Sequence, residues 1–220
     1  MALRVLIGGE TSRTIASAFE ARGHYVLTAD FRPCQRGGNH YQGPWEHVQG
    51  DGWDLAIFHR TCTNMANSGA KHLYRNMKKE NGIDEGRFID CLRDAWDFWN
   101  HRNKCPVRFA AWENPVMLPY AQSIIGKPSQ VVQPWWFGDD PDGPDNVKKA
   151  TCWWLNELPK LKPTGSLDGS TARDEVFRMA PTKDPNERRM ARSVFTPGHA
   201  AAIADLWGPW VANQLANRAA

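Results

Sequence analysis

Two reactive side chains stand out in this 220-residue chain, the thiol of Cys62 and the carboxyl of Glu113. Cys62 comes shortly after the apolar run Trp53–Phe58, and Glu113 comes directly after the apolar run Val107–Trp112. We expect both runs to be central strands of a sheet, with a reactive group at the carboxyl end of each. Such a pair is suited to attack on a pyrimidine ring: the sulfur adds to C6 as the nucleophile, and the acid holds N3 and supplies a proton. Taken alone, Cys62 is also compatible with a buried, inert thiol.

The residues next to this pair add to the interpretation. His59 and Arg60 place positive charge near Cys62, which favours a thiolate. A carboxyl group directly after an apolar strand is costly to bury unless it has partners or a function. Asn114 precedes Pro115, so it is restricted to an extended geometry that stiffens the turn behind the acid.

The start of the chain has a strand–helix–strand pattern. We expect a strand over 4–9, a helix over 14–22 and a second strand over 25–30, an order typical of nucleotide-binding folds. Gly8-Gly9 lets a helix N-terminus approach an anionic or polar ligand, or forms only a turn. Asp30 ends the second strand, where a carboxylate binds ribose hydroxyls in such folds, unless it is a solvated loop acid.

Strands and helices continue to alternate further along the chain. The pattern predicts a loop over 34–52, a buried strand over 53–58, a helix over 84–101, a strand over 107–112, a strand over 150–155 and an amphipathic helix over 199–213. This order indicates one α/β domain with a doubly wound, mostly parallel sheet. Within it we expect the core sheet and helices in 1–160, an irregular segment in 161–192, and a C-terminal helix in 193–220 that packs back on the core.

Net charge, cysteine spacing and the distribution of apolar residues limit the kinds of partner and site that we expect. The net charge of +3 permits contact with nucleic acid without requiring it, and the 11 tryptophans serve core packing or stacking on bases. The five cysteines form no CxxC pair, which indicates free thiols in a reducing cytoplasm. No apolar run is long enough to span a membrane, and the Cys and His spacing predicts no metal site. In the last helix, Trp207 and Trp210 lie on an apolar stripe that we expect to pack on the core rather than form a dimer interface.

Several motifs together resemble the small, phage-type relatives of the cytosine-C5 DNA methyltransferases. The resemblance runs from Arg4 to about Trp207. The matching segments are Cys62-Thr63 with Asn67-Ser68-Gly69, Glu113-Asn114-Pro115-Val116-Met117, Gln133-Pro134-Trp135-Trp136-Phe137-Gly138, Lys149–Leu155, Leu161–Thr164 and Ser193–Gly198. The resemblance implies the methyltransferase version of the doubly wound sheet, S-adenosylmethionine as the cofactor, and DNA or a nucleotide as the substrate.

The resemblance also implies a role for each matching residue. Cys62 is the nucleophile, and Glu113 with Asn114 forms the acid motif. The implied cofactor residues are Gly8, Gly9, Glu10 and Asp30, with Thr196 and Gly198 at the start of a last helix that folds back beside the cofactor. The expected substrate residues are Arg60, Thr63, Asn67, Ser68, Lys149 and Thr151. The resemblance implies that Lys149 helps to orient the base, whereas Arg60 stands where the family has a proline and is expected to contact a phosphate.

The chain differs from the family in three ways. Arg60-Thr61-Cys62 stands where the family commonly has Pro-Pro-Cys. The family's Gln-Gly-Asp, whose acid binds the adenine amine, aligns best with Gln42-Gly43-Pro44, and a proline cannot accept that hydrogen bond, which is worth about 1.5–3 kcal/mol. A second copy, Gln49-Gly50-Asp51, places Asp51 in this role after a shift of register. Finally, no segment is long enough for a separate target-recognition domain, so low specificity, single-stranded substrates, free nucleotides or a partner protein are all open.

The leading hypothesis is therefore methyl transfer from S-adenosylmethionine to C5 of cytosine in DNA. A second hypothesis is a catalytically degenerate protein that binds a nucleotide, a nucleic acid or a host defence protein. A third retains the Cys and Glu chemistry but transfers another group, or modifies a pyrimidine nucleotide before polymerisation.

Overall fold

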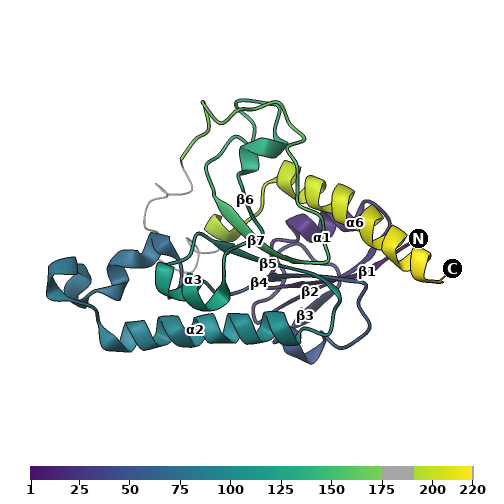
Figure 1. Cartoon of the computed structure of the whole chain (residues 1–220). Coiled ribbons are helices and arrows are strands. Elements are labelled where there is room, and N and C mark those ends of the chain that lie inside the picture. Colours follow the sequence, from purple (N-terminus) through teal and green to yellow (C-terminus); the bar gives the residue numbers. More distant parts are fainter. Residues whose placement is uncertain (175–190, 220) are drawn as a thin grey trace.

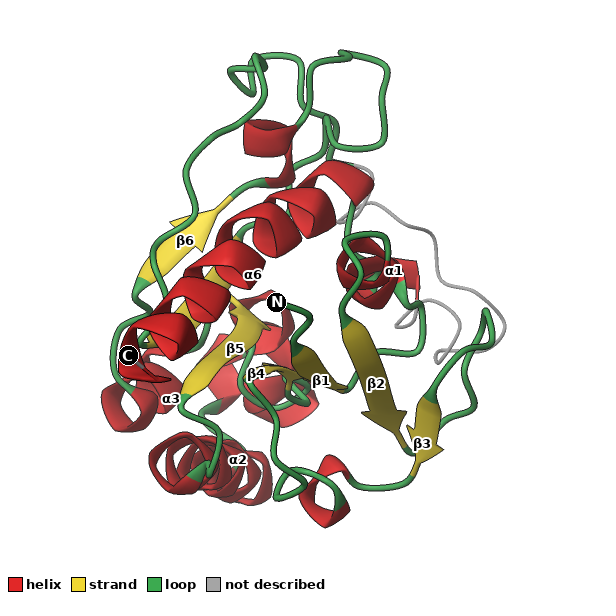
Figure 2. Ribbon diagram, turned by 90° about the vertical axis from the view of Figure 1, so that its right-hand side faces the viewer, coloured by secondary structure: helices red, strands yellow, loops and turns green. Residues whose placement is uncertain are grey.

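The computed structural model describes residues 1–174 and 191–219. These residues form one α/β domain in which a single sheet is covered by helices on both faces (Figures 1 and 2). The predicted irregular segment 161–192 falls partly outside the described residues.

The sheet has seven strands in the order β3-β2-β1-β4-β5-β7-β6. Strands β1 to β5 pair in parallel, whereas β7 runs antiparallel to both β5 and β6. This order with one reversed strand is the methyltransferase version of the Rossmann-like sheet. The strands are β1 Arg4–Gly8, β2 Tyr25–Asp30, β3 His40–Gln42, β4 Leu55–His59, β5 Phe109–Pro115, β6 Gln130–Val132 and β7 Thr151–Asn156.

In the described part of the chain, four α-helices cover the sheet. The helices α1 (Thr14–Glu20) and α6 (Pro197–Ala219) pack on one face, and α2 (Glu85–Lys104) and α3 (Pro119–Ile125) pack on the other. The connections contain the 3₁₀ turns η1 Trp45–His47, η2 Asn67–Leu73, η3 Arg75–Met77, η4 Lys79–Asn81 and η5 Pro134–Phe137.

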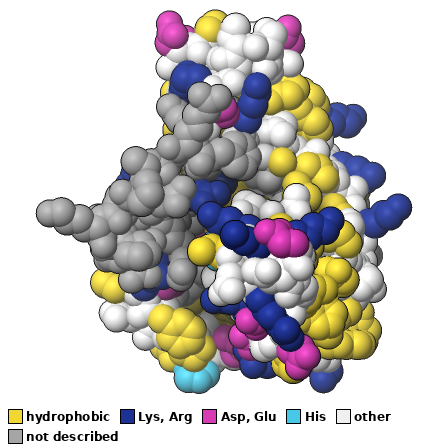
Figure 3. All heavy atoms as spheres, turned by 90° about the vertical axis from the view of Figure 1, so that its left-hand side faces the viewer, with side chains coloured by type: hydrophobic (Ala, Val, Ile, Leu, Met, Phe, Trp, Pro, Cys, Tyr) yellow, Lys and Arg dark blue, Asp and Glu magenta, His cyan; other side chains and the backbone are white. Residues whose placement is uncertain are grey.

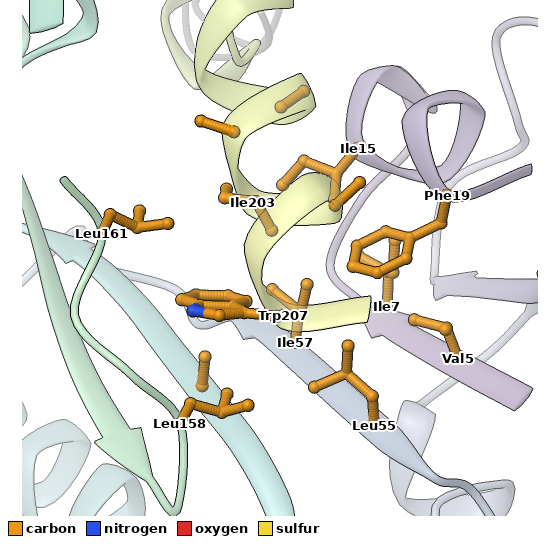
Figure 4. Packing of buried hydrophobic residues seen from close by; sticks show 14 of the residues in the cluster. Val5, Ile7, Ile15, Phe19, Leu55, Ile57, Leu158, Leu161, Ile203 and Trp207 are labelled. Atoms are coloured by element: carbon orange, nitrogen blue, oxygen red, sulfur yellow. The ribbon is translucent and has the colours of Figure 1, made fainter. Parts of the chain in front are cut away.

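The core beneath α1 and α6 is filled by large apolar side chains. Trp207 is fully buried, and its Nε1 donates a hydrogen bond to the carbonyl oxygen of Pro159 at 3.0 Å. Figure 4 shows Trp207 and Ile203 of α6 facing apolar residues of β1 and β4, such as Ile57 of β4. Core packing of Trp207 is therefore confirmed, whereas Trp210 is 40% exposed and lies at the edge of this contact.

The structure corrects two predicted boundaries. The expected loop 34–52 contains β3, a three-residue edge strand that pairs with β2 through its backbone and has no apolar pattern to reveal it. The expected strand 107–112 starts at Phe109 and continues to Pro115, because Glu113 and Asn114 pair with Trp153 and Cys152 of β7. Glu113 and Asn114 therefore lie within β5 rather than after it.

Within residues 1–174 and 191–219, no helix combines the length and apolar character needed to cross a membrane. The same residues contain no group of three or more side chains placed to hold a metal ion.

Candidate functional site

The carboxyl ends of the parallel strands meet at one edge of the sheet. Gly8 pairs with Phe58, and His59 pairs with Glu113, so the ends of β1, β4 and β5 are adjacent. Gly9 follows with a φ of +81°, and a Cβ placed on it would lie 2.3 Å from the carbonyl oxygen of His59. Only glycine satisfies both conditions, so the turn after β1 sits directly against the end of β4.

Glu113 contacts His59, which the sequence analysis placed beside Cys62 but not beside the acid. The Nδ1 of His59 lies 3.1 Å from Oε2 of Glu113, and the two side chains are only 12% and 14% exposed. The imidazole ring is flanked by Phe195, at 5.1 Å between ring centroids, and by Trp153, at 6.4 Å. The imidazole that contacts the acid therefore lies among aromatic rings.

Lys149 lies within electrostatic reach of both reactive groups. Burial lowers the pKa of its ammonium group, while the nearby Glu113 and Cys62 act in the opposite direction. Its Nζ donates to the carbonyl oxygen of Val194 at 2.8 Å and lies 5.2 Å from the ring centroid of Phe195. Lys149 therefore lies near both Cys62 and Glu113, the other two residues predicted to take part in the reaction.

The segments that follow Cys62 and Glu113 are hydrogen-bonded to each other. Met65 donates to the carbonyl oxygen of Cys62 at 3.0 Å and accepts from Leu118 at 2.7 Å. Asn67 donates to the carbonyl oxygen of Val116 at 2.8 Å. These bonds couple the position of the partly buried Cys62 to the end of β5.

A pocket of ≈ 200 Å³ opens beside this loop. Of the predicted substrate residues, Thr63 lines it, while Asn67 and Ser68 are exposed on η2. The remaining lining residues are Asn64, Gly69, His72, Leu73, Arg87 and Leu118.

Two other predicted substrate residues have mainly internal contacts. The guanidinium of Arg60 lies over the ring of Trp45 at 5.7 Å, and burial lowers its pKa against the influence of carboxylates that include Asp94 and Asp97. Thr151 is buried and donates its Oγ1 hydrogen to the carbonyl oxygen of Lys149 at 3.0 Å. Thr151 therefore supports the backbone of Lys149 and does not reach the surface.

Asp30 and Gln42-Gly43-Pro44, the predicted ribose acid and adenine segment, lie side by side at the same edge. Oδ1 of Asp30 accepts from the backbone N–H of Arg32 at 2.8 Å, and the backbone N–H of Gly43 donates to the carbonyl oxygen of Asp30 at 2.9 Å. Gln42-Gly43-Pro44 is thereby placed next to the end of β2. Asp51 lies at the opposite edge, where its carbonyl oxygen accepts from the side chain of Arg4 at the start of β1. The structure therefore does not bring Asp51 to the cofactor region.

Glu10 has a structural partner, the first turn of α1. It is 5% exposed, and its carboxylate accepts from the backbone N–H groups of Ile15 at 2.8 Å and Ala16 at 3.2 Å. A carboxylate in this position caps the helix and complements its dipole. In the structure, this predicted cofactor residue therefore stabilises the turn between Gly9 and α1.

The start of α6 is fixed by Asp145. Its carboxylate accepts from the backbone N–H groups of Gly198 at 2.9 Å and His199 at 3.3 Å. A Cβ on Gly198 would meet the carbonyl oxygen of Phe137 at 2.3 Å, so this residue serves close packing. Oγ1 of Thr196 is buried and has no hydrogen-bond partner among the described residues.

His199 of α6 packs against the aromatic rings of Trp153 and Phe195, which flank His59. It is 1% exposed, and burial, together with the positive charge of the nearby Lys149, lowers its pKa to about 3. The sequence analysis did not single out Asp145, and it did not predict that His59 contacts Glu113 or that Phe195 packs on His59, because these contacts join segments far apart in the chain. For His59 a signal was present, since it directly follows an apolar strand paired with the strand of Glu113.

The residues at the edge of β1 and β2 fit S-adenosylmethionine in part. The tight turn at Gly9 and the partly buried carboxylate of Asp30 match the places for its backbone and ribose contacts. Nε1 of Trp45, a ring that packs against Gly8, is buried with no acceptor among the described residues, so a donor is present on this side. Pro44 supplies no acceptor for the adenine amine.

Comparisons with known proteins add little to this description. No family model matches the chain, and no curated protein matches it. Among solved structures, one similar chain is described as "putative DNA modification methyltransferase encoded within prophage Cp-another structure (E.coli)". It has 11% sequence identity and a TM-score of 0.43, and the match covers 74% of this chain and 51% of that chain. Our chain thus matches about half the length of that protein, and a similarity at this level does not decide function.

Proposed function

We propose that this protein is an S-adenosylmethionine-dependent methyltransferase that modifies C5 of cytosine in DNA. The observation that supports the proposal best is the convergence of Cys62, Glu113 and Lys149 at the carboxyl ends of β4 and β5. The glycine turn after β1 abuts the same edge. A nucleophile, an acid and a cation are thus adjacent to a place suited to the cofactor.

Each of the three groups has a role in attack on the ring. The thiolate of Cys62 forms a bond to C6, and the electron pair of the C5–C6 double bond moves towards C5. Glu113 donates a proton to N3, which neutralises the ring as the sulfur adds. The ammonium of Lys149 favours the thiolate before attack. When bound, S-adenosylmethionine would supply the methyl group to C5 and leave as S-adenosylhomocysteine. Loss of the C5 proton to water, cleavage of the sulfur–C6 bond and return of the N3 proton to Glu113 then restore the thiolate and the acid.

Four residues are proposed to hold the cofactor. Gly8 and Gly9 allow its close approach to the backbone, and Asp30 accepts from the ribose hydroxyls. Thr196 offers a hydroxyl whose oxygen is buried and unpaired among the described residues.

The loop after Cys62 favours a nucleic acid over a free nucleotide as the substrate. Its side chains include exposed lysines and arginines that suit contact with a phosphate backbone. Figure 3 shows Lys and Arg side chains gathered, with some acidic ones, on the face that carries η2 to η4. The exposed basic residues of this segment are Lys71, Arg75, Lys78, Lys79 and Arg87.

A labelled methyl-transfer assay tests the proposal. Single-stranded DNA, duplex DNA, RNA, dCMP and dCTP are each incubated with the protein and methyl-labelled S-adenosylmethionine, and the nucleosides are then identified. We expect 5-methyldeoxycytidine from DNA, its loss in Cys62→Ala and Glu113→Gln, and its retention in Cys105→Ala, a partly buried cysteine between α2 and β5 that precedes the opposite end of β5 from Glu113. Undiminished transfer by Cys62→Ala would exclude the mechanism.

A further inference from the structure

His59 and Glu113 occupy paired positions at the ends of β4 and β5. Since the strands are parallel and the residues are in register, their side chains emerge on the same face of the sheet. The resulting contact joins Nδ1 of His59 to Oε2 of Glu113 at 3.1 Å. The proposed reaction uses the acid but leaves this contact without a role.

We infer that His59 is a positioning residue that determines which oxygen of Glu113 carries the transferable proton. This inference rests on the proposed function. The Nδ1–H of His59 donates to Oε2, so that oxygen serves as an acceptor, and the proton resides on Oε1. The acid therefore presents its O–H towards the base and not towards the protein.

The surroundings of the ring favour this tautomer. Phe195 and Trp153 flank the imidazole, and Nε2 is buried without a hydrogen-bond partner among the described residues. A buried N–H without an acceptor is rarer in proteins than an under-used acceptor. In the form with hydrogen on Nδ1, only a lone pair is left without a partner at Nε2. In the other neutral form, an N–H group is left without an acceptor there.

The contact strengthens as the reaction proceeds. When the sulfur of Cys62 bonds to C6, the Oε1–H bond of Glu113 breaks, its proton moves to N3 of the base, and the electron pair stays on the carboxylate. That negative charge is shared with Oε2, to which Nδ1–H of His59 already donates. Because hydrogen bonds to charged acceptors are stronger than those to neutral ones, His59 stabilises the state after proton transfer more than the state before it.

Two further titratable groups face this pair from the elements around it. Lys149 precedes β7, and His199 comes from α6. Because the ammonium of Lys149 also lies near Glu113, substitutions at His59 alone are needed to separate the influence of the histidine from that of the lysine.

Steady-state kinetics of two His59 variants test the inference. His59→Leu removes the donor while keeping an apolar side chain among the aromatic rings; we expect kcat to fall about 10- to 100-fold with KM unchanged. His59→Asn places an amide N–H near the position of Nδ1 and restores most of kcat. His101→Leu, which removes a buried histidine on the other face of the sheet, keeps kcat. Loss of kcat in His59→Leu without rescue by His59→Asn would assign His59 a merely structural role and overturn the inference.

A measurement on the free protein separates this inference from the proposed function. Nitrogen-15 NMR of the imidazole reports which ring nitrogen carries the hydrogen, and it needs no substrate. We expect His59 to carry hydrogen on Nδ1 in the natural protein and to lose that preference in Glu113→Ala. Hydrogen on Nε2, or a spectrum unaffected by Glu113→Ala, would overturn the inference. If the protein gave the expected spectrum but transferred no methyl group, the contact between His59 and Glu113 would be supported and the proposed function would be rejected.

Discussion

Replacing Gly9 by alanine tests the packing that joins the cofactor turn to the catalytic strand. The φ of +81° costs an alanine about 1–2 kcal/mol. The added Cβ also lies 2.3 Å from the carbonyl oxygen of His59, so the turn and the end of β4 must separate, which adds about 1–3 kcal/mol. We therefore expect Gly9→Ala to lower the free energy of unfolding by about 2–5 kcal/mol. The shift also displaces His59 from Glu113 and weakens binding of S-adenosylhomocysteine.

Gly23→Ala is the matched control for this prediction. Gly23 has a φ of +79°, and a Cβ placed on it would meet nothing within 4 Å. It carries the backbone strain alone, so we expect a loss of about 1–2 kcal/mol and no change in ligand affinity. Urea denaturation gives the unfolding free energies, and calorimetry gives the affinities. Equal destabilisation by the two variants would refute the claim that close packing at Gly9 holds the site together.

Three further predictions follow from named contacts. Asp145→Ala removes the cap of α6 and lowers the free energy of unfolding by about 2 kcal/mol in urea denaturation. Asp142→Ala, in the exposed part of the same loop, changes this free energy by no more than about 0.5 kcal/mol. Similar losses in both variants would contradict the capping role of Asp145. His199 has a pKa of about 3 in the folded protein, below the usual 6.5, so the unfolded chain takes up a proton first and stability is lost as the pH falls from 6.5 towards 3. Between pH 7 and pH 5 this histidine lowers the free energy of unfolding by about 2 kcal/mol. The variant His199→Leu should remove that part of the pH dependence. An unchanged dependence would show that His199 is not held neutral. Pro44→Asp supplies the missing acceptor and should tighten calorimetric binding of S-adenosylhomocysteine about 10- to 100-fold, an improvement that would be absent if the adenine lay elsewhere.

The sequence predicted the central strands and the doubly wound order well because apolar runs and helix periodicity record burial directly. It placed β1, β2 and α1 close to their observed positions. It missed β3, which is held by backbone pairing with β2, and it ended β5 too early, because polar residues inside a paired strand look like a loop. Both errors arise where the partner strand, and not the local sequence, determines the structure.

The same limit applies to the site. Cys62, Glu113 and Lys149 were predicted from their motifs, and the structure brings them together. His59 is placed against Glu113 by strand register, a long-range relation that residue types do not reveal. The structure also distinguishes the two Gln-Gly copies, since Gln42-Gly43-Pro44 adjoins Asp30 while Asp51 lies at the opposite edge.

Covalent trapping of the nucleophile tests the central claim most directly. In an oligonucleotide with 5-fluorocytosine, the fluorine on C5 cannot leave as a proton does, so the bond between sulfur and C6 persists after methyl transfer. With S-adenosylmethionine present, intact-mass spectrometry should show the protein plus one methylated oligonucleotide, with the link mapped to Cys62 and absent in Cys62→Ala. An adduct that persists in Cys62→Ala, or no adduct in a protein that binds S-adenosylhomocysteine and the oligonucleotide, would contradict attack by Cys62.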